Sequence, residues 1–312
     1  MDRTPQDNAA AARRTSPRDC GVNNCGVTSP VCALTIAGSD PSGGAGIQAD
    51  LKTFMAAGCY GAGVVTALTA QNTLGVAAAH APDPEFVALE LRLVLDDLPV
   101  KAAKTGMLFS GPIARAVAGE LKRKNFPLVV DPVVLATRAS RGIPLLDEDG
   151  IKVLRENMLP LADLATPNRP EAELLTGIAI TGRESLFAAM DKMLSFGCKA
   201  VLIKGGHMKA GVEAGEAGEP GLDAGEGVLT DWLGRPGCEP LPLPVRRVDT
   251  PHTHGTGCAL SAAITARLAR GDALADAIRA SQAWLGRALA AGFAVGRGAS
   301  PPNHMVAFDA NS

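Results

Sequence analysis

Short apolar runs alternate with amphipathic helical segments along almost the whole chain. The strand-like runs are Cys32–Ala37, Gly63–Ala70, Val100–Ala103, Leu128–Asp131, Asp163–Thr166 and Ala200–Lys204. The helix-like segments between them are Gly44–Ala57, Pro84–Leu95, Pro112–Lys124, Asp147–Leu159, Pro170–Thr176 and Glu184–Phe196. This order predicts an α/β fold in which helices cover both faces of a mostly parallel sheet.

The pattern changes toward the C-terminus. Two runs that read as edge strands, Gly227–Leu233 and Leu241–Val248, precede two helical segments, Thr256–Arg270 and Asp272–Ala291. Asp272 is a candidate N-cap for the last helix, and Gly292 is a candidate stop.

Residues 1–30 contain no apolar segment typical of a secretory signal and are predicted to be a disordered tail. A single domain is expected over residues 31–306, followed by a C-terminal tail at 307–312. The glycine-rich and acidic segment 205–227 is interpreted as a surface loop, with an active-site lid as the alternative.

Composition excludes several classes of partner. The chain has 312 residues with 46% hydrophobic content, which suffices for a large core. Its 30 basic and 32 acidic residues nearly cancel, so no broad field favours nucleic acid or a membrane surface. No apolar run approaches the roughly 20 residues that a membrane span needs. Seven scattered cysteines without a Cys-x-x-Cys pair fit a reducing, cytoplasmic setting.

The run from His254 to Ser261 consists mostly of small residues and opens a predicted helix. Backbone N–H groups at a helix start have no intrahelical partner, and the helix dipole adds positive charge there. The run therefore suits a bound anion such as a phosphate. The alternative is a turn whose glycines only permit a positive φ.

Polar residues recur where the predicted strands end. They are Asp40, Gln71, Lys104, Asp131, Asn168 and Lys204. Since ligand sites of parallel sheets lie at the carboxyl ends of the strands, these side chains are expected to share one site.

A second glycine-rich cluster, Gly38–Gly46, follows the first strand. Its glycine spacing matches a dinucleotide-binding fingerprint, but that fingerprint also requires an acidic residue at the end of the second strand, where this chain has Gln71. The chain has no Gly-x4-Gly-Lys-Ser/Thr motif, which excludes a P-loop NTPase. Asp50 follows on the apolar side of the next helix and needs a partner there, either a structural cation or a ligand.

These motifs resemble one family closely. Ile36–Lys52 is similar to the opening signature of the hydroxymethylpyrimidine/phosphomethylpyrimidine kinases of thiamine biosynthesis. The other matching segments follow in order: Thr66–Thr73, Lys104–Leu108, Asp131–Val133, Thr166–Ala172, Lys204–His207 and Thr253–Cys258. Together they cover roughly residues 32–305.

The resemblance implies a ribokinase-like three-layer α/β/α sandwich with a mostly parallel central sheet. It implies ATP and Mg²⁺ as cofactors and 4-amino-5-hydroxymethyl-2-methylpyrimidine as the substrate. One site would phosphorylate first the hydroxyl group and then the monophosphate. The family also suggests a homodimer.

By resemblance, Gln71 reads the pyrimidine, with Gly38 and Asp50 nearby and Met107 as an apolar wall. The amide of Gln71 offers the donor and the acceptor that a pyrimidine edge requires. Plain core packing is the alternative for Met107.

Four further residues would receive the transferring phosphoryl group through backbone N–H groups: Gly255, Thr256, Gly257 and Cys258. Cys258 occupies the family's catalytic position. A thiol at a helix N-terminus is expected to have a lowered pKa and to take the substrate's proton. The alternative is a small buried residue without a proton role.

The resemblance also assigns the groups around the nucleotide. Asp131 and Glu171 would lie near Mg²⁺, and Asn168 and Lys204 would contact the ATP phosphates. Two other functions stay open. One is a pyridoxal or pyridoxine kinase of the same superfamily, and the other is a non-catalytic ligand-binding relative.

Overall fold

The structure is a computed structural model that describes residues 29–134, 146–205 and 227–308. The described residues after Pro30 belong to one compact unit. The predicted disordered tail falls almost entirely outside the described residues, as does nearly all of the predicted loop 205–227.

The unit is built around a central sheet. Within the described ranges, the strands of this sheet follow the order β3-β2-β1-β4-β5-β6-β7-β8-β9. Their bounds are β1 Cys32–Ser39, β2 Tyr60–Asn72, β3 Gly75–His80, β4 Val100–Thr105, β5 Leu128–Val130, β6 Leu164–Ala165, β7 Val201–Ile203, β8 Val228–Gly234 and β9 Leu241–Arg246. Six neighbouring strands pair in parallel, in the order β2, β1, β4, β5, β6 and β7. The edge strand β3 and the β8–β9 hairpin are attached by antiparallel pairing.

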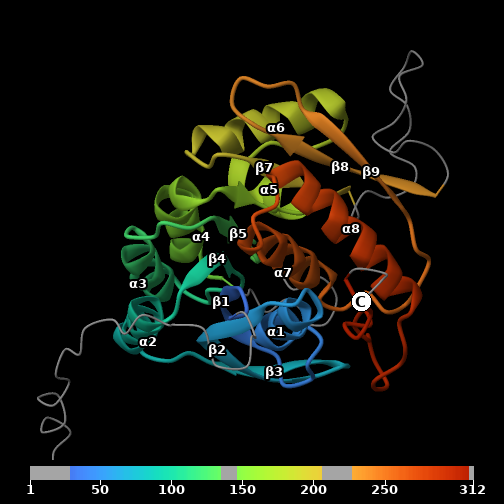
Figure 1. Cartoon of the computed structure of the whole chain (residues 1–312). Coiled ribbons are helices and arrows are strands. Elements are labelled where there is room, and N and C mark those ends of the chain that lie inside the picture. The colour runs from blue at the N-terminus through green and yellow to red at the C-terminus, as the bar shows by residue number, and fades with distance from the viewer. Residues whose placement is uncertain (1–28, 135–145, 206–226, 309–312) are drawn as a thin grey trace, which may run out of the picture. The chain divides into compact units, whose positions relative to one another are not determined.

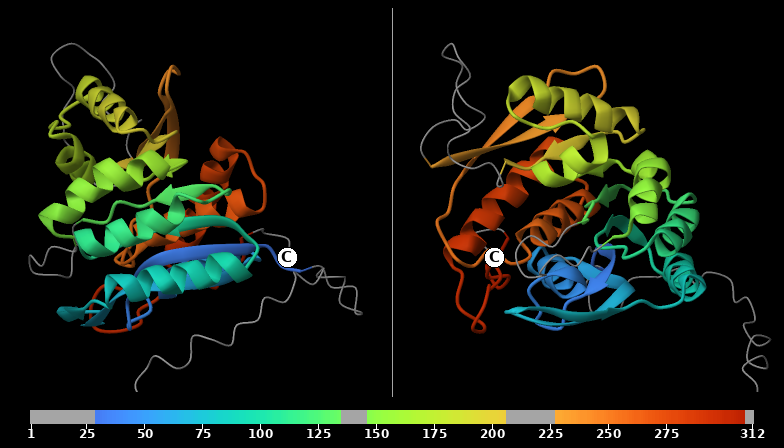
Figure 2. Two further views of the ribbon diagram at one scale, coloured as in Figure 1. Left: turned by 90° about the vertical axis from the view of Figure 1, so that its left-hand side faces the viewer. Right: turned by 180° about the vertical axis from the view of Figure 1, so that it is seen from behind.

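Helices cover both faces of this sheet (Figure 1). Their bounds are α1 Gly46–Ala56, α2 Pro84–Asp97, α3 Gly111–Leu121, α4 Glu148–Val153, α5 Arg169–Thr176, α6 Arg183–Ser195, α7 Thr256–Ala269 and α8 Leu274–Ala290. One core cluster packs α2 to α6 on one face, and a second packs α1, α7 and α8 on the other. The two further views in Figure 2 show these two helical layers with the sheet between them. The predicted three-layer α/β/α architecture is confirmed.

The largest difference from the sequence-based prediction lies at the first edge of the sheet. Strand β2 continues to Asn72 and turns back through Thr73 and Leu74 into β3, which was not predicted. The sequence of β3, Gly-Val-Ala-Ala-Ala-His, has neither the β-branched content nor the alternation that marks a strand.

Two helices also differ from prediction. The expected helix Asp147–Leu159 ends early as α4, followed by a π-helical turn (Leu154–Met158) and a 3₁₀ turn (Leu159–Leu161). Pro160 lacks the N–H group that a continuing α-helix needs. Asp272 does not cap α8; its carboxylate accepts from the Arg267 guanidinium, and Ala273 holds the cap position.

The C-terminal boundary lies further on than predicted. Phe308 is buried and stacks on Trp284 with ring centroids 5.1 Å apart, so it belongs to the core rather than to a tail that begins at 307. Residues 309–312 lie outside the described ranges.

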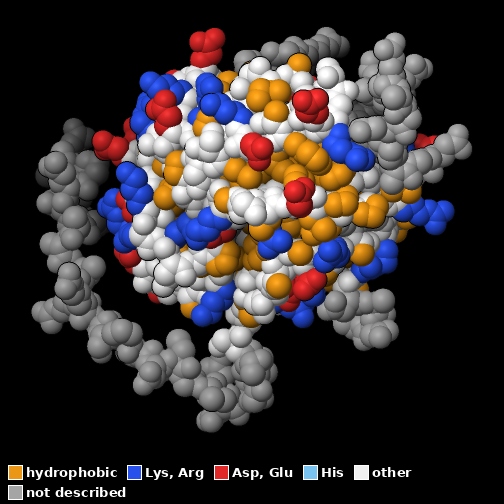
Figure 3. Space-filling model, turned by 90° about the horizontal axis from the view of Figure 1, so that it is seen from above, with side chains coloured by type: hydrophobic (Ala, Val, Ile, Leu, Met, Phe, Trp, Pro, Cys, Tyr) orange, Lys and Arg blue, Asp and Glu red, His pale blue; other side chains and the backbone are white. Residues whose placement is uncertain are grey.

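Two surface properties bear on possible partners. In the described part of the chain, no helix has the length and apolar character required to cross a bilayer. Figure 3 shows basic and acidic side chains interspersed around an apolar area on the visible face, without a large field of one sign.

Candidate active site

Five of the six predicted strand-end residues do gather at the carboxyl edge of the sheet. Asp40 directly follows β1 and Gln71 lies at the end of β2. Asp131, Asn168 and Lys204 follow β5, β6 and β7. The sixth, Lys104, lies inside β4, where its side chain is completely buried.

Asp40 joins the two glycine-rich turns. Its carboxylate accepts hydrogen bonds from the backbone N–H groups of Ser42, Gly44 and Ala45, and it lies 3.0 Å from Nε2 of His254. Burial alone would raise the pKa of Asp40, but the hydrogen bonds from His254, Ser42 and Gln71 hold it well below its usual range. The ionised carboxylate therefore ties the loop after β1 to the turn before α7.

Gly255 begins α7 in a conformation that only glycine adopts easily. Its φ is 72°, and a Cβ there would collide with the carbonyl oxygen of Gly44. The backbone of one turn therefore lies directly against the other.

The start of α7 presents free donors to this junction. The N–H groups of Gly257 and Cys258 have no hydrogen-bond partner among the described residues. The N–H of Gly46 lies near the Cys258 sulfur and acts to lower the pKa of that thiol. Free amides at a helix start suit a bound anion, which is the ligand that the sequence analysis expects there.

A cation lies beside these amides. Nζ of Lys204 is 3.1 Å from Oδ1 of Asp131, and it is 3.4 Å from where a Cβ on Gly257 would lie. Burial lowers the pKa of Lys204, but the nearby charges of Asp131 and Glu171 outweigh that effect and raise it. Lys204 is therefore a charged ammonium group at the start of α7.

Asp131 is the acceptor at the centre of this network. Oδ1 accepts from Thr166 at 3.1 Å as well as from Lys204, and Oδ2 accepts from the Ser261 hydroxyl at 3.0 Å. Sequence reasoning missed the contacts of Thr166 and Ser261. Thr166 lies within a motif segment and Ser261 ends the run of small residues at the start of α7, but no spacing rule predicts which hydroxyl reaches the carboxylate.

Asn168 and Glu171 bond to each other at the start of α5. The Asn168 side chain accepts from the N–H of Glu171 at 2.9 Å, and the Glu171 carboxylate accepts from the N–H of Asn168 at 2.8 Å. This reciprocal arrangement is a capping box. Burial, with the charge of Asp131 added, raises the pKa of Glu171 to about 7 although Lys204 opposes the shift.

The acidic groups suit Mg²⁺ rather than a metal held by many protein ligands. Among the described residues, no group of three or more His, Cys, Asp or Glu side chains could hold a metal ion. Mg²⁺ usually takes one or two carboxylates and completes its shell with water and phosphate oxygens. Asp131 and Glu171 supply that number, and the unfavourable burial of ionised Glu171 is what a bound cation would relieve.

The expected low pKa of Cys258 is not found. Burial, with the negative charges of Asp50 and Asp131 added, raises the pKa of the thiol to about 11, and Lys104 opposes this only in part. The desolvation of a thiolate at this position outweighs the effect of the helix N-terminus, so the residue is a neutral thiol at neutral pH.

The predicted substrate-binding residues Gly38, Gln71 and Met107 lie on β1, at the end of β2 and just after β4. Gly38 contacts Met107, since a Cβ on Gly38 would collide with the Met107 methyl group. The Met107 carbonyl accepts from the Thr66 hydroxyl at 2.5 Å, which fixes the backbone after β4. Gln71, at the end of β2, is near enough to Asp40 to help lower the pKa of that carboxyl.

Asp50 lies deeper than the other three. Its carboxylate is fully buried, 2.7 Å from Nζ of Lys104 and 2.6 Å from the Thr35 hydroxyl. Of the two partners that the sequence left open, the structure shows the cation. The residue that supplies it, Lys104, was expected at the surface of the site.

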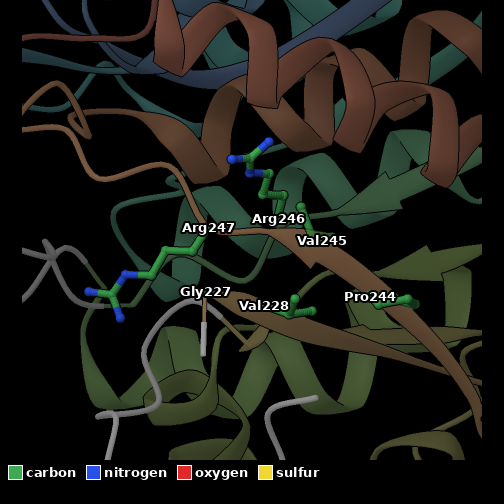
Figure 4. A pocket seen from close by; sticks show the side chains of 6 residues that line it. All are labelled: Gly227, Val228, Pro244, Val245, Arg246 and Arg247. Atoms are coloured by element: carbon green, nitrogen blue, oxygen red, sulfur yellow. The ribbon is translucent and has the colours of Figure 1, made fainter. Parts of the chain in front are cut away.

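A pocket of about 530 Å³ opens at the same edge of the sheet, where β8 begins and β9 ends. Its lining residues are Gly227, Val228, Pro244, Val245, Arg246 and Arg247, shown in Figure 4. The two arginine side chains point in different directions there. Strand β8, which lines the pocket, is the direct neighbour of β7, the strand that Lys204 follows.

Comparisons with known proteins show similarity over most of the chain. The family model for phosphomethylpyrimidine kinase matches residues 40–303. A hydroxymethylpyrimidine/phosphomethylpyrimidine kinase from Rhizobium meliloti is 46% identical over 88% of this chain and 96% of its own length.

Two solved structures are similar over most of the chain. A phosphomethylpyrimidine kinase from Clostridium difficile is 37% identical with a TM-score of 0.68, covering 83% of this chain and 99% of its own. A pyridoxal kinase from Staphylococcus aureus, in complex with AMP-PCP and pyridoxal, is 28% identical with a TM-score of 0.75, covering 89% and 95%.

Proposed function

Because the chain belongs to the phosphomethylpyrimidine kinase family, we propose that it phosphorylates 4-amino-5-hydroxymethyl-2-methylpyrimidine and then the resulting monophosphate, with ATP as the donor. Family membership confirms the predicted ribokinase-like fold and the predicted place among the kinases of thiamine biosynthesis. The roles of individual residues, the metal and the subunit arrangement are proposals.

The observation that carries the mechanism is the start of α7. The free N–H groups of Gly257 and Cys258 and the ammonium group of Lys204 converge on one place. Phosphoryl transfer needs mainly charge stabilisation and alignment at the transferred group, and this combination supplies both.

In each transfer, an oxygen of the substrate bonds to the γ-phosphorus of ATP, and the bond from that phosphorus to the β,γ-bridging oxygen breaks. ADP leaves with the electron pair. In the first transfer the acceptor hydroxyl also loses its proton. The turn at Gly255 and Thr256 orients the amides, and the charge that develops on the phosphoryl oxygens lies against them.

Cys258 has a narrower role than the sequence suggested. A thiol with a pKa of about 11 is not a thiolate at neutral pH. We assign Cys258 to hold the attacking hydroxyl by hydrogen bonding, and the proton passes late, once the new O–P bond is forming, to an oxygen of the transferred phosphoryl group and from there to water, as a loose transition state allows.

The nucleotide and the metal are placed by the remaining charged groups. Lys204 and Asn168 would contact the ATP phosphates, and Asp131 and Glu171 would hold Mg²⁺, in part through water. Bound Mg²⁺ would neutralise charge on the nucleotide phosphates. The apolar and cationic lining of the pocket between β8 and β9 suits the remainder of a nucleotide.

The pyrimidine would lie between Gly38 and Met107, with the Gln71 amide on its polar edge. Asp50 would act indirectly, because its oxygens are taken by Lys104 and Thr35.

Pyridoxal is the second candidate substrate, because the pyridoxal kinase structure has a TM-score of 0.75 with this chain. A coupled ADP-release assay with Mg-ATP, offering hydroxymethylpyrimidine and pyridoxal in parallel, decides between them. We expect kcat/KM to be at least tenfold higher for the pyrimidine. A preference for pyridoxal would overturn the substrate, and turnover of neither would favour a non-catalytic relative.

We also propose a homodimer. Phe86, Leu89 and Leu93 lie at helical spacing on α2 with exposed fractions of 60%, 45% and 60%. Exposed apolar stripes of this kind usually mark interfaces. Light scattering should give twice the 31.9 kDa chain mass, and Leu89→Glu should give the monomer. Met55→Glu on α1 is the exposed control, and a monomeric wild type would refute the proposal.

The cytoplasm is the proposed location. ATP is available there, and the described cysteines are free thiols, which suits a reducing compartment. Detection of the native protein in a membrane or secreted fraction would contradict this.

A further inference from the structure

Asp231 of β8 is a buried carboxylate that the mechanism above does not use. It is only 7% exposed. One oxygen accepts from the backbone N–H of Gly205 at 2.7 Å, and the other accepts from the side-chain amide of Gln282 on α8 at 2.7 Å. Burial raises the pKa of Asp231, so holding a charge here is unfavourable in itself. A side chain needed only for packing would be apolar.

The partner of Asp231 directly follows Lys204. Strands β7 and β8 are antiparallel, and Ile203 pairs with Trp232, which brings the next residues, Lys204 and Asp231, opposite each other. In such a pair both side chains lie on the same face of the sheet. That face carries α7 and α8, since the neighbouring Leu233 packs in their core cluster.

Gly205 is held from two sides. A Cβ on Gly205 would collide with the carbonyl oxygen of Thr230, so its backbone lies tightly against β8. The carboxylate of Asp231 fixes its N–H. On the other side, the N–H of Lys204 donates to the carbonyl of Pro167 at 3.0 Å. The backbone around Lys204 is therefore fixed by β8 as well as by the loop before α5.

From these contacts we infer that Asp231 is a positioning residue, which sets the Lys204 ammonium group against the start of α7 by holding Gly205. Gln282 fixes the orientation of the carboxylate from α8, the helix that follows α7 in the same layer. The inference rests on the proposed function in one respect, the contact of Lys204 with the ATP phosphates.

A substitution can separate the two hydrogen bonds of Asp231 from its negative charge. An asparagine at position 231 keeps one oxygen for the N–H of Gly205, and its amide can donate to the Gln282 side chain after that amide rotates by 180°. Asp231→Asn therefore retains both hydrogen bonds without the charge. Asp231→Ala removes both.

The test measures the Kd of the non-hydrolysable nucleotide AMP-PCP with Mg²⁺ by calorimetry, and KM for both substrates. We expect Asp231→Ala to weaken nucleotide binding at least tenfold and to leave KM for the pyrimidine within twofold. Asp231→Asn should stay within threefold of the wild type. Ser281→Ala is the matched control, because it removes a buried hydrogen bond within α8 that does not reach Lys204. It should not change the Kd.

A double-mutant cycle with Lys204→Ala decides between positioning and general destabilisation. If Asp231 acts through Lys204, Asp231→Ala weakens binding less than twofold further once Lys204 is removed. Full additivity, or an Asp231→Ala variant that binds normally, would overturn the inference. If Lys204→Ala itself binds AMP-PCP normally, Lys204 does not contact the ATP phosphates as proposed. The inference that Asp231 positions Lys204 for that contact is then refuted as well.

Discussion

The buried ion pair between Asp50 and Lys104 gives the sharpest prediction about stability. Both side chains are completely buried, and the charged atoms are 2.7 Å apart. Removal of one partner leaves an uncompensated charge in the core, which typically costs about 3–5 kcal/mol. We therefore expect Lys104→Met to lower the free energy of unfolding by about that amount.

The double variant Asp50→Asn with Lys104→Met should recover much of this loss, because it removes the unpaired charge while keeping a similar volume. Chemical denaturation monitored by circular dichroism gives all three values. Arg115→Met is the control, since the Arg115–Asp149 pair has the same 2.7 Å separation but is about half exposed. It should change stability little. A Lys104→Met variant as stable as Arg115→Met would refute the reasoning, as would equal losses for the single and double variants.

Three further predictions test the site itself. Gly255→Ala should abolish turnover and destabilise the fold, because its Cβ would meet the Gly44 carbonyl. Gly58→Ala is the control: Gly58 has a similar φ of 73° but open space around it, so this variant should lose only about 1–2 kcal/mol of stability. Equal effects of the two variants in thermal melts would contradict the packing argument. With a thiol pKa of about 11, Cys258 should be alkylated by iodoacetamide at pH 8 far more slowly than the exposed Cys238, as peptide mass mapping would show; comparable rates would mean that the pKa is not raised. The pKa of Glu171 is raised from 4.5 to about 7, so its contribution to stability is present below pH 4.5 and is lost as pH rises through 7. That loss is on the order of 3 kcal/mol, and Glu171→Gln should remove it from the pH profile of unfolding; an unchanged profile would speak against the shift.

Much of the fold was predictable because the apolar runs of parallel strands are short and regularly separated by helices. The gathering of five of the polar residues was predictable for the same reason, since strand ends meet at one edge. Lys104 was the exception, because β4 continues past it. The β3 strand was not, because alanine-rich residues carry no strand signal. Its pairing depends on β2 extending to Asn72, which is a tertiary feature.

The electrostatics of the site were less predictable than its composition. The sequence shows that Cys258 is at the start of a helix, but not that the charges of Asp50, Asp131 and Lys104 act on its thiol. The sequence likewise places Asp50 on the apolar face of a helix, but its partner Lys104 is 54 residues away on strand β4. Such long-range contacts set pKa values, and local spacing does not encode them.

The most direct test of the proposed chemistry is the mass of the product formed from hydroxymethylpyrimidine with excess Mg-ATP. If the start of α7 receives two successive phosphoryl groups, the monophosphate should appear first and then convert to the diphosphate, with two ADP released for each pyrimidine consumed. Both steps should be lost in Lys204→Ala. Accumulation of the monophosphate alone would contradict a second transfer at this site, and an active Lys204→Ala variant would contradict the proposed role of its ammonium group.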